Sequence, residues 1–301
     1  MKIHWTGIYP ALTTKFHADG RVDLPLFAKN LEAQLAAGVE GVILGGSLGE
    51  ASTLTLEDKQ LLVRQSLDVC RGKVPVLLNV AESSTVEAQH LVKTAEAWGV
   101  DGFMILPPLK YKADDRETVT YFKRVAGVTG KPFMIYNNPF DYKIEVTIPM
   151  FAELAAVPNI QAVKESSRDI TNITRMRNAF GDRFAILGGV DTLSLESLVT
   201  GADGLVAGLV CAFPQETVAI YKLVKQGRLA EALAIYRWFM PLLELDIHPK
   251  LVQYIKLAES EVGLGSELVR EPRLPLQGEE RARILKIIRD GIATRPVLPR
   301  L

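Results

Sequence analysis

The sequence lacks the features that mark several large classes of protein. Its 301 residues include only 2 cysteines, Cys70 and Cys211, which form neither a metal-binding CxxC pair nor a disulfide framework. We interpret them as two buried structural thiols. The 35 Lys and Arg residues equal the 35 Asp and Glu residues, so there is no basic excess for nucleic acid. The 4 histidines have no ligand spacing, and we predict no metal site.

Long apolar runs and polybasic runs are also missing. The longest uncharged apolar stretch, around residues 204–214, is far shorter than the roughly 20 residues of a transmembrane helix. The first residues lack the apolar core and cleavage site of a signal peptide. With 48% hydrophobic and 23% charged residues, the composition is that of a globular protein. We expect a cytoplasmic protein that binds neither nucleic acid nor a membrane.

Apolar runs of strand length alternate with amphipathic stretches of helix length through the first 227 residues. This alternation predicts a parallel sheet, and eight units favour a closed barrel over an open doubly wound sheet. An open dinucleotide-binding sheet would place a glycine-rich turn after the first strand, whereas Gly45–Gly49 follows the second and has the wrong spacing. The predicted strands are Gly7–Leu12, Gly41–Leu44, Val74–Val80, Gly102–Leu106, Pro132–Asn137, Ile160–Lys164, Phe184–Gly188 and Gly204–Ala207.

A helix is predicted after each strand, and three more follow the last unit. We therefore predict an α/β protein, a (β/α)8 TIM barrel over residues 1–227 with a three-helix extension packed on it over residues 228–301. The predicted helices are Asp23–Ala37, Leu56–Cys70, Thr85–Trp98, Asp115–Val128, Ile148–Ala156, Ile170–Phe180, Leu193–Thr200, Pro214–Gln226, Leu229–Leu243, Leu251–Val262 and Glu279–Ile292.

The sixth predicted strand ends in a lysine. In barrel enzymes the reacting groups lie at the carboxyl ends of the strands. Strand alternation places Ile160, Ala162 and Lys164 on one face, so the lysine follows two apolar residues to the barrel mouth. Burial lowers the pKa of a lysine, and attack on a carbonyl requires the free amine. A lone lysine at a strand end is more often solvated or paired with an acid, and that alternative stays open.

The fifth and second strands add a phenol and a glycine-rich turn. Tyr136 ends the neighbouring strand, and a phenol beside Lys164 can relay protons, although a packing role is also open. The turn after the second strand contains Gly46, Ser47 and Leu48. Its backbone N–H groups can hold a carboxylate, or its glycines can serve only a tight turn.

The seventh and eighth strands end in small residues that keep the mouth open. Gly188 and Gly189 end the seventh strand, and Val206 lies in the eighth. Asp191 could bind a hydroxyl or an amine, or it could cap the helix that opens at Thr192.

Together these segments resemble the dihydrodipicolinate synthase/N-acetylneuraminate lyase family of Schiff-base barrels. The resemblance runs from Thr6 to about Leu276, and its motifs are Gly46–Glu50, Tyr136-Asn137-x-Pro139, Val163-Lys164-Glu165 and Gly188-Gly189. It implies that Lys164 forms an imine with the substrate and that no other cofactor is used. It also implies that Tyr136 transfers protons and that Ser47 bridges this tyrosine and a carboxylate held by the N–H groups of Ser47 and Leu48.

The resemblance completes the candidate site and suggests an assembly. Besides the catalytic Lys164, Tyr136 and Ser47, the substrate-binding candidates are Gly46, Leu48, Asn138, Ser166, Gly189, Asp191 and Val206. The partner is a small-molecule 2-oxo acid or cyclic imine, and the family implies a homotetramer built as a dimer of dimers.

Three positions depart from the synthase branch of this family. Leu48 stands where a second threonine is common, and Asp141 stands where the synthases have an arginine that grips a second carboxylate. The loop after the fourth strand carries Tyr111 rather than paired tyrosines, and whether it enters a neighbouring subunit's site stays open. Because Asp141 would repel a dicarboxylate, these departures argue against dihydrodipicolinate synthesis.

A hydroxylated substrate with one carboxylate fits these residues better. Asp191 and Ser166 resemble the hydroxyl-binding side of the sialic-acid lyases, and the segment Leu245–Lys256 resembles the 1-pyrroline-4-hydroxy-2-carboxylate deaminases of hydroxyproline breakdown. Dehydration of a 2-keto-3-deoxy sugar acid is the close alternative, followed by a pyruvate-dependent aldolase. A carboxylate-binding sensor is the non-enzymatic alternative, although binding alone needs no nucleophilic amine.

Overall fold

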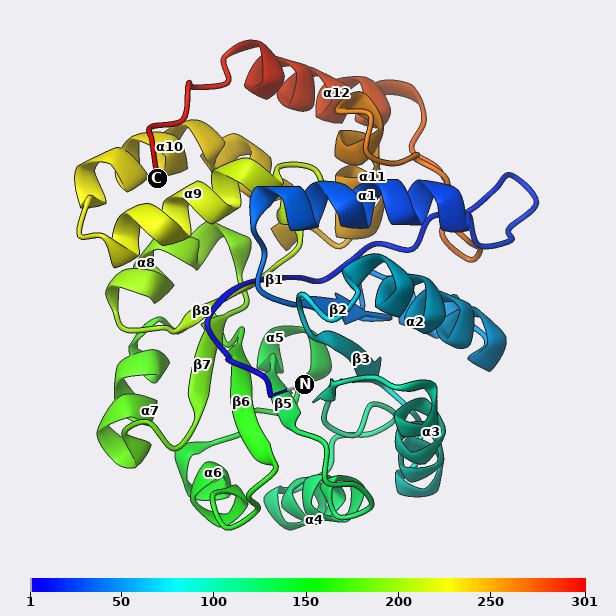
Figure 1. Cartoon of the computed structure of the whole chain (residues 1–301), viewed down its shortest axis with the longest axis vertical. Helices are drawn as coiled ribbons and strands as arrows, with labels where there is room; N and C mark the ends of the chain where they lie inside the picture. The colour runs from blue at the N-terminus through cyan, green and yellow to red at the C-terminus, as the bar shows by residue number, and fades with distance from the viewer. Residues whose placement is uncertain (1) are drawn as a thin grey trace.

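Eight parallel strands form a barrel with its helices outside. The computed structural model describes residues 2–301. The strands are hydrogen-bonded in the order β1-β8-β7-β6-β5-β4-β3-β2, and a parallel bridge between Ala11 and Ile43 closes the ring (Figure 1). This confirms the predicted barrel. The strands are β1 Gly7–Pro10, β2 Val42–Leu44, β3 Val76–Val80, β4 Gly102–Ile105, β5 Phe133–Asn137, β6 Ile160–Glu165, β7 Ala185–Gly188 and β8 Gly204–Ala207.

The predicted helix after each strand is present, with ends that differ by at most two residues. Polar caps fix several starts: Thr55 accepts from the Asp58 N–H, and the Asp58 carboxylate accepts from the Thr55 N–H, which begins the second helix. The helices of the barrel are α1 Leu24–Ala37, α2 Leu56–Cys70, α3 Thr85–Trp98, α4 Asp115–Ala126, α6 Ile148–Leu154, α7 Thr171–Phe180, α8 Ser194–Val199 and α9 Pro214–Lys225. The short helix α5, Pro139–Tyr142, has no counterpart in the sequence prediction.

The strands divide their side chains between two hydrophobic clusters. One cluster fills the barrel interior, and the other packs the outer faces of the strands against the helices. Alternate residues of a strand point to opposite faces, so Ala162 lies inside while Val163 lies outside. The inner cluster includes Tyr9, Ile43, Leu77, Met104, Met134, Tyr136, Ala162, Leu187 and Val206.

A β-bulge corrects one detail of the sixth strand. Phe133 pairs with Ile160, but the next residue, Met134, pairs with Ala162. The extra residue on β6 reverses the alternation below it. Ile160 therefore packs in the outer cluster, and its predicted place on the Lys164 face is wrong.

The C-terminal segment adds the three predicted helices, α10 Leu229–Leu243, α11 Leu251–Glu261 and α12 Gly278–Ala293. Between the first two lie the 3₁₀ turn η4, Glu244–Ile247, and a short connection. Figure 1 shows α12 lying across α10 and α11, on the side of the barrel that carries α1 and α9. Residues of this segment and of the barrel share one hydrophobic cluster, and the boundary at residue 227 stays a prediction.

Two expectations from composition can be compared with the structure. No helix within residues 2–301 is long and apolar enough to cross a bilayer. Cys70 and Cys211 are both free and buried, which confirms their interpretation as structural thiols. Burial raises the pKa of the Cys70 thiol to about 11.

Candidate active site

A polar cavity of about 550 Å³ opens at the carboxyl ends of the strands. It contains the predicted Lys164 and Tyr136 on adjacent strands, β6 and β5, where the two residues are register partners. Residues from the ends of six strands or the loops that follow them, and from the C-terminal segment, line it. They are Ala11, Ser47, Tyr136, Asn138, Asp141, Lys164, Ser166, Arg168, Gly189, Val190, Val206, Gly208, Asp246, Ile247 and Leu251.

Lys164 is held between a phenol ring and a glycine. Its Nζ lies 4.1 Å from the centre of the Tyr136 ring, and both residues are only 7% exposed. On the other side, a Cβ atom on Gly189 would lie 2.6 Å from Cγ of Lys164 and 2.2 Å from Oγ of Ser166. Only glycine leaves space for the lysine chain at position 189.

Burial sets the protonation of both groups. It lowers the pKa of the Lys164 amine from its usual 10.5. Nearby acidic groups, above all Asp246, oppose this shift and raise the pKa. Burial also raises the pKa of the Tyr136 phenol above its usual 10.0. Lys164 is therefore biased toward the nucleophilic free amine, and Tyr136 keeps its proton at neutral pH.

Glu165 fixes the loop that follows the lysine. Its side chain points away from the cavity and accepts from Asn137 Nδ2 at 3.0 Å, from Asn172 Nδ2 at 2.7 Å and from the Ser167 N–H at 2.7 Å. These bonds join the ends of β5 and β6 to α7. Successive side chains of a strand point to opposite faces, so Glu165 lies on the face away from Lys164. There its carboxylate accepts these three hydrogen bonds, which gives the acid a structural role.

The turn after β2 presents two N–H groups without partners. The N–H groups of Ser47 and Leu48 make no hydrogen bond within residues 2–301, so they are free to hold an anion. The turn is held in place by the Thr14 hydroxyl, which donates to the Gly49 carbonyl at 2.7 Å. A Cβ atom on Gly49 would lie 2.8 Å from the Leu12 carbonyl oxygen, so this position needs glycine.

Ser47 contacts a tyrosine that the sequence did not indicate. Its hydroxyl is hydrogen-bonded to the Tyr142 hydroxyl, not to Tyr136. The Tyr142 ring packs edge-on against the Tyr136 ring, with the ring centres 5.5 Å apart. The expected bridge from Ser47 to a tyrosine is thus made to a residue of the short helix α5.

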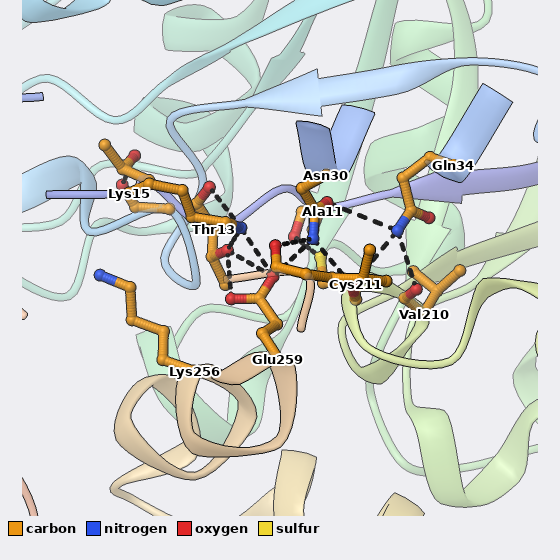
Figure 2. Close-up of polar contacts among 12 residues, drawn as sticks. Ala11, Thr13, Lys15, Asn30, Gln34, Val210, Cys211, Lys256 and Glu259 are labelled. Atoms are coloured by element: carbon orange, nitrogen blue, oxygen red, sulfur yellow. Dashed lines mark hydrogen bonds and ion pairs between the residues drawn. The ribbon is translucent and has the colours of Figure 1, made fainter. Parts of the chain in front are cut away.

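A buried polar network links the loop after β1 to Glu259 of α11. Figure 2 shows Thr13, Lys15 and Asn30 converging on Glu259. Lys15 Nζ lies 2.7 Å from Glu259 Oε1, and the Thr13 hydroxyl donates to the same carboxylate at 2.8 Å. All four side chains are buried. The loop after β1 is thereby tied to the C-terminal helices.

A second buried ion pair lies at the end of the glycine-rich turn. Lys256 Nζ lies 2.5 Å from Glu50 Oε1, and both side chains are fully buried. The Arg270 N–H donates to Glu50 Oε2 at 3.0 Å. Burial lowers the pKa of Lys256 to about 8, even beside this carboxylate. Because Glu50 follows Gly49 directly, this pair anchors the candidate carboxylate-binding turn.

Asp191 does not cap the helix that opens at Thr192, which was one of its two predicted roles. Its carboxylate accepts from the Gly208 N–H at 3.0 Å and from the Leu209 N–H at 2.7 Å. It therefore caps the 3₁₀ turn after β8 and not the helix that opens at Thr192. Burial raises its pKa above the usual 3.8, although these two N–H groups oppose the shift.

Polar and aromatic side chains surround the cavity near α5. Asn138 Nδ2 donates to the Tyr136 hydroxyl at 3.1 Å and to Asp141 Oδ2 at 2.7 Å. Arg168, whose backbone has a φ of 65°, lays its guanidinium on the Phe140 ring, 3.4 Å from the ring centre. The cavity therefore holds an aspartate at the position where an arginine was expected in synthases, and an arginine on the opposite loop.

The structure brings most of the predicted site residues together, with three exceptions. Ser47, Tyr136, Asn138, Lys164, Ser166, Gly189 and Val206 line one cavity. Gly46, Leu48 and Asp191 do not, and the Leu48 side chain packs in the outer core. Tyr111 is 58% exposed and lies in a separate groove beside Glu82 and Arg116.

Two polar lining residues, Arg168 and Asp246, were missed by the sequence prediction, as was Tyr142, which is hydrogen-bonded to the lining residue Ser47. Asn138, which caps α5, was a signal for a helical turn that brings Tyr142 back to the cavity. Asp246 comes from η4, and no strand pattern could place it there. No group of three or more His, Cys, Asp or Glu side chains in the described chain is arranged to hold a metal.

Comparison with known proteins gives consistent matches along most of the chain. The model of the dihydrodipicolinate synthetase family matches residues 4–290. A 4-hydroxy-tetrahydrodipicolinate synthase of Exiguobacterium sibiricum is 33% identical over 279 residues, covering 92% of this chain and 93% of that protein. The protein of the same name from Methanoculleus marisnigri is 31% identical over 288 residues, covering 94% and 98%.

Solved structures agree with the sequence matches. Dihydrodipicolinate synthase DapA-2 of Bacillus anthracis superposes with a TM-score of 0.91 at 27% identity, covering 96% of this chain and 99% of that one. YagE, a prophage protein of E. coli K12 solved in complex with pyruvate, superposes with a TM-score of 0.89 at 26% identity, covering 95% and 98%.

Proposed function

Because the chain belongs to the dihydrodipicolinate synthetase family of class I Schiff-base lyases, we propose that it acts on a small hydroxylated 2-oxo acid or its cyclic imine. The substrate that fits best is 1-pyrroline-4-hydroxy-2-carboxylate, converted to 2-oxoglutarate semialdehyde and ammonia. The family works through a lysine imine and needs no external cofactor, and Lys164 is the lysine that occupies the cavity.

The acidic lining of the cavity carries this proposal. Asp141 and Asp246 line it, and Asp191 lies close enough to interact with Lys164. Carboxyl groups bind hydroxyls and amines, and the negative charge of Asp141 repels a second carboxylate on a substrate. The single anion-binding turn at Ser47 and Leu48 suits a monocarboxylate with a hydroxyl at its other end.

The reaction opens with attack by the free amine. The substrate carboxylate binds to the N–H groups of Ser47 and Leu48, which directs C2 toward Lys164. The lysine nitrogen adds to C2, the bond from C2 to the ring nitrogen breaks, and the released nitrogen takes up a proton. The product is an open-chain imine on Lys164 with an amine at C5 and the hydroxyl still at C4.

The imine then activates the neighbouring carbon. Its protonated nitrogen accepts electrons when a proton leaves C3, which gives an enamine. Tyr136 and the Ser47–Tyr142 pair lie beside Lys164 to move this proton. The enamine expels the C4 hydroxyl as water. A shift of the double bond then gives an imine at C5, and two water molecules release ammonia and Lys164. One water is consumed overall.

A trapping experiment tests the proposal. Purified enzyme is incubated with 1-pyrroline-4-hydroxy-2-carboxylate and borohydride, ammonia is measured in parallel, and mass spectrometry locates the adduct. We expect ammonia release and a reduced adduct on Lys164. The matched control is Lys131→Ala, an exchange of a lysine at the opposite end of the barrel, before β5. A Lys164→Ala variant with full turnover would contradict the proposal.

A synthase-like condensation of pyruvate is the second candidate function. The names of the curated relatives favour it, and Arg168 could hold a second carboxylate from the opposite loop. Consumption of pyruvate with an aldehyde acceptor, without ammonia release from the cyclic imine, would support this function. Dehydration of a 2-keto-3-deoxy sugar acid uses the same imine and enamine steps and belongs in the same screen, as does aldol cleavage, which would release pyruvate.

We also propose that the chain forms a homotetramer, a dimer of dimers. The loop after β4 exposes Tyr111 at 58% and Leu109 at 37%, and aromatic and aliphatic residues of this kind are common at subunit contacts. Light scattering should give four times the 33.2 kDa of one chain. A single-chain mass at micromolar concentration would contradict the assembly.

A further inference from the structure

Asp246 reaches the active site from outside the barrel. It lies on η4, between α10 and α11, and lines the same cavity as Lys164. Its carboxylate occupies the space above Gly208, where a Cβ atom would lie only 2.2 Å from Asp246 Oδ1. Glycine at the end of β8 therefore allows this carboxyl group to enter the cavity.

Asp246 differs from the nearby carboxyl groups of Asp141 and Asp191 because its carboxylate oxygens have no partner. Asp191 accepts from two backbone N–H groups, and Asp141 accepts from Asn138. The Asp246 carboxylate makes no hydrogen bond or ion pair within residues 2–301. A partly buried carboxyl group without a partner is costly, so a ligand that hydrogen-bonds to it would gain affinity.

The two proton-carrying groups lie on different sides of Lys164. Tyr136 is on β5, the strand on one side of β6, whereas Asp246 lies above the end of β8, two strands away on the other side. A substrate bound through C2 to Lys164 can therefore meet Tyr136 near one part of its chain and Asp246 near another.

Burial favours the protonated form of Asp246. Burial raises its pKa well above the usual 3.8, and the charge of Asp191 adds to the shift. Lys164 and Arg168 oppose it, and Asp141 supports it. A carboxyl group that keeps its proton near neutral pH can act as a general acid.

We propose that Asp246 binds the leaving hydroxyl of the substrate and protonates it as the C4–O bond breaks. In this step the nitrogen lone pair of the enamine re-forms the C2 imine, the C3–C4 double bond forms, and the C4–O electrons leave with the oxygen. The Asp246 proton completes a water molecule, and solvent returns a proton to the carboxylate before the next turnover. This role rests on the proposed function and assigns its dehydration step to a residue of the C-terminal extension.

This role is tested by combining a variant that lacks the acid, Asp246→Asn, with a substrate whose C4 hydroxyl is replaced by a different leaving group. Asp246→Asn keeps the shape of the side chain but removes its acidic proton. Turnover of 1-pyrroline-4-hydroxy-2-carboxylate should fall at least about 100-fold, while borohydride trapping of pyruvate on Lys164 persists. The 4-fluoro analogue expels fluoride without needing a proton. Its turnover by the variant should therefore stay within about threefold of wild type.

The pH profile gives a second readout. Because the acid must be protonated, wild-type turnover of the hydroxyl substrate should decline as the pH rises through the Asp246 pKa. The fluoro substrate should not show this decline. Glu244→Gln, an exposed acid on the same turn, is the matched control and should leave both substrates within twofold of wild type.

Each outcome separates the two proposals. Wild-type enzyme that traps pyruvate but releases no ammonia from the hydroxylated imine overturns the proposed function. Normal ammonia release with a fully active Asp246→Asn variant overturns only the role of Asp246. An equal loss on the hydroxyl and fluoro substrates also overturns it, since it would show a general structural defect. If Asp246→Asn fails to fold, Asp246→Ser carries the same comparison.

Discussion

The side chain of Lys164 lies directly against the backbone of Gly189. A Cβ atom on Gly189 would lie 2.6 Å from Lys164 Cγ and 2.7 Å from its Cε. The Lys164 amine is therefore positioned by the absence of a side chain at Gly189, directly after the neighbouring strand β7, as well as by the Tyr136 ring on the other side. Position 189 controls where the amine can reach a substrate.

Gly189→Ala should displace Lys164 and lower kcat by about 10- to 100-fold, because a misplacement of about 1 Å can cost 100-fold. Steady-state kinetics and the rate of borohydride trapping measure the effect. Gly130→Ala is the matched control, since a Cβ atom there meets nothing within 4 Å. Unchanged trapping by Gly189→Ala would show that the lysine does not need this space.

Lys164→Met should abolish turnover and raise the melting temperature at pH 7. The folded chain holds Lys164 at a lowered pKa, whereas the unfolded chain holds it near 10.5. The folded state therefore disfavours the charged amine, which costs stability at every pH below 10.5 and most at low pH. The difference in Tm between variant and wild type should shrink as the pH rises toward 10.5. A lower Tm for Lys164→Met would refute this reasoning.

Glu259→Gln should destabilise the fold by about 3–5 kcal/mol, because the buried Lys15 would lose its counter-charge. Urea unfolding followed by circular dichroism measures the loss. The exposed pair of Lys286 and Asp290 provides the control, and Asp290→Asn should change stability by no more than about 0.5 kcal/mol. Equal effects of the two substitutions would count against a stabilising role for the buried pair.

Asp141→Asn should tighten the binding of a dicarboxylate relative to pyruvate. Removal of one negative charge at the cavity relieves a repulsion of about 1 kcal/mol, or roughly fivefold in affinity. Inhibition constants of 2-oxoglutarate and pyruvate, measured on wild type and variant, give the ratio. If the ratio does not change, Asp141 does not select against a second carboxylate.

The barrel could be predicted because its physical signal is local. Strands buried on both faces must be apolar, and each is followed by a helix of regular period, so the eight units are visible in the sequence. Lys164 and Tyr136 could be placed together because register partners on adjacent parallel strands follow from the same pattern. Ile160 was misplaced because one extra residue in β6 reverses the alternation, and nothing in the composition of that strand reveals it.

The residues that were missed depend on how the chain folds back. Tyr142 reaches Ser47 because Asn138 and Pro139 begin a one-turn helix after β5. Asp246 reaches Lys164 because the segment after α10 returns over β8, a contact between positions far apart in sequence. Such long-range contacts leave no periodic pattern in the sequence. The cavity residues of the loops and of the C-terminal segment were therefore less predictable than the strand that carries Lys164.

The split origin of the site has a consequence for how such a protein can change during evolution. Lys164 and Tyr136 are built into strands whose neighbours are tightly packed, whereas Asp246 stands on a 3₁₀ turn of the extension, partly open to solvent. If Asp246 has the proposed role, a single substitution in that turn would change which group leaves the substrate and would disturb no barrel strand. The reaction could then change while imine formation on Lys164 stayed the same.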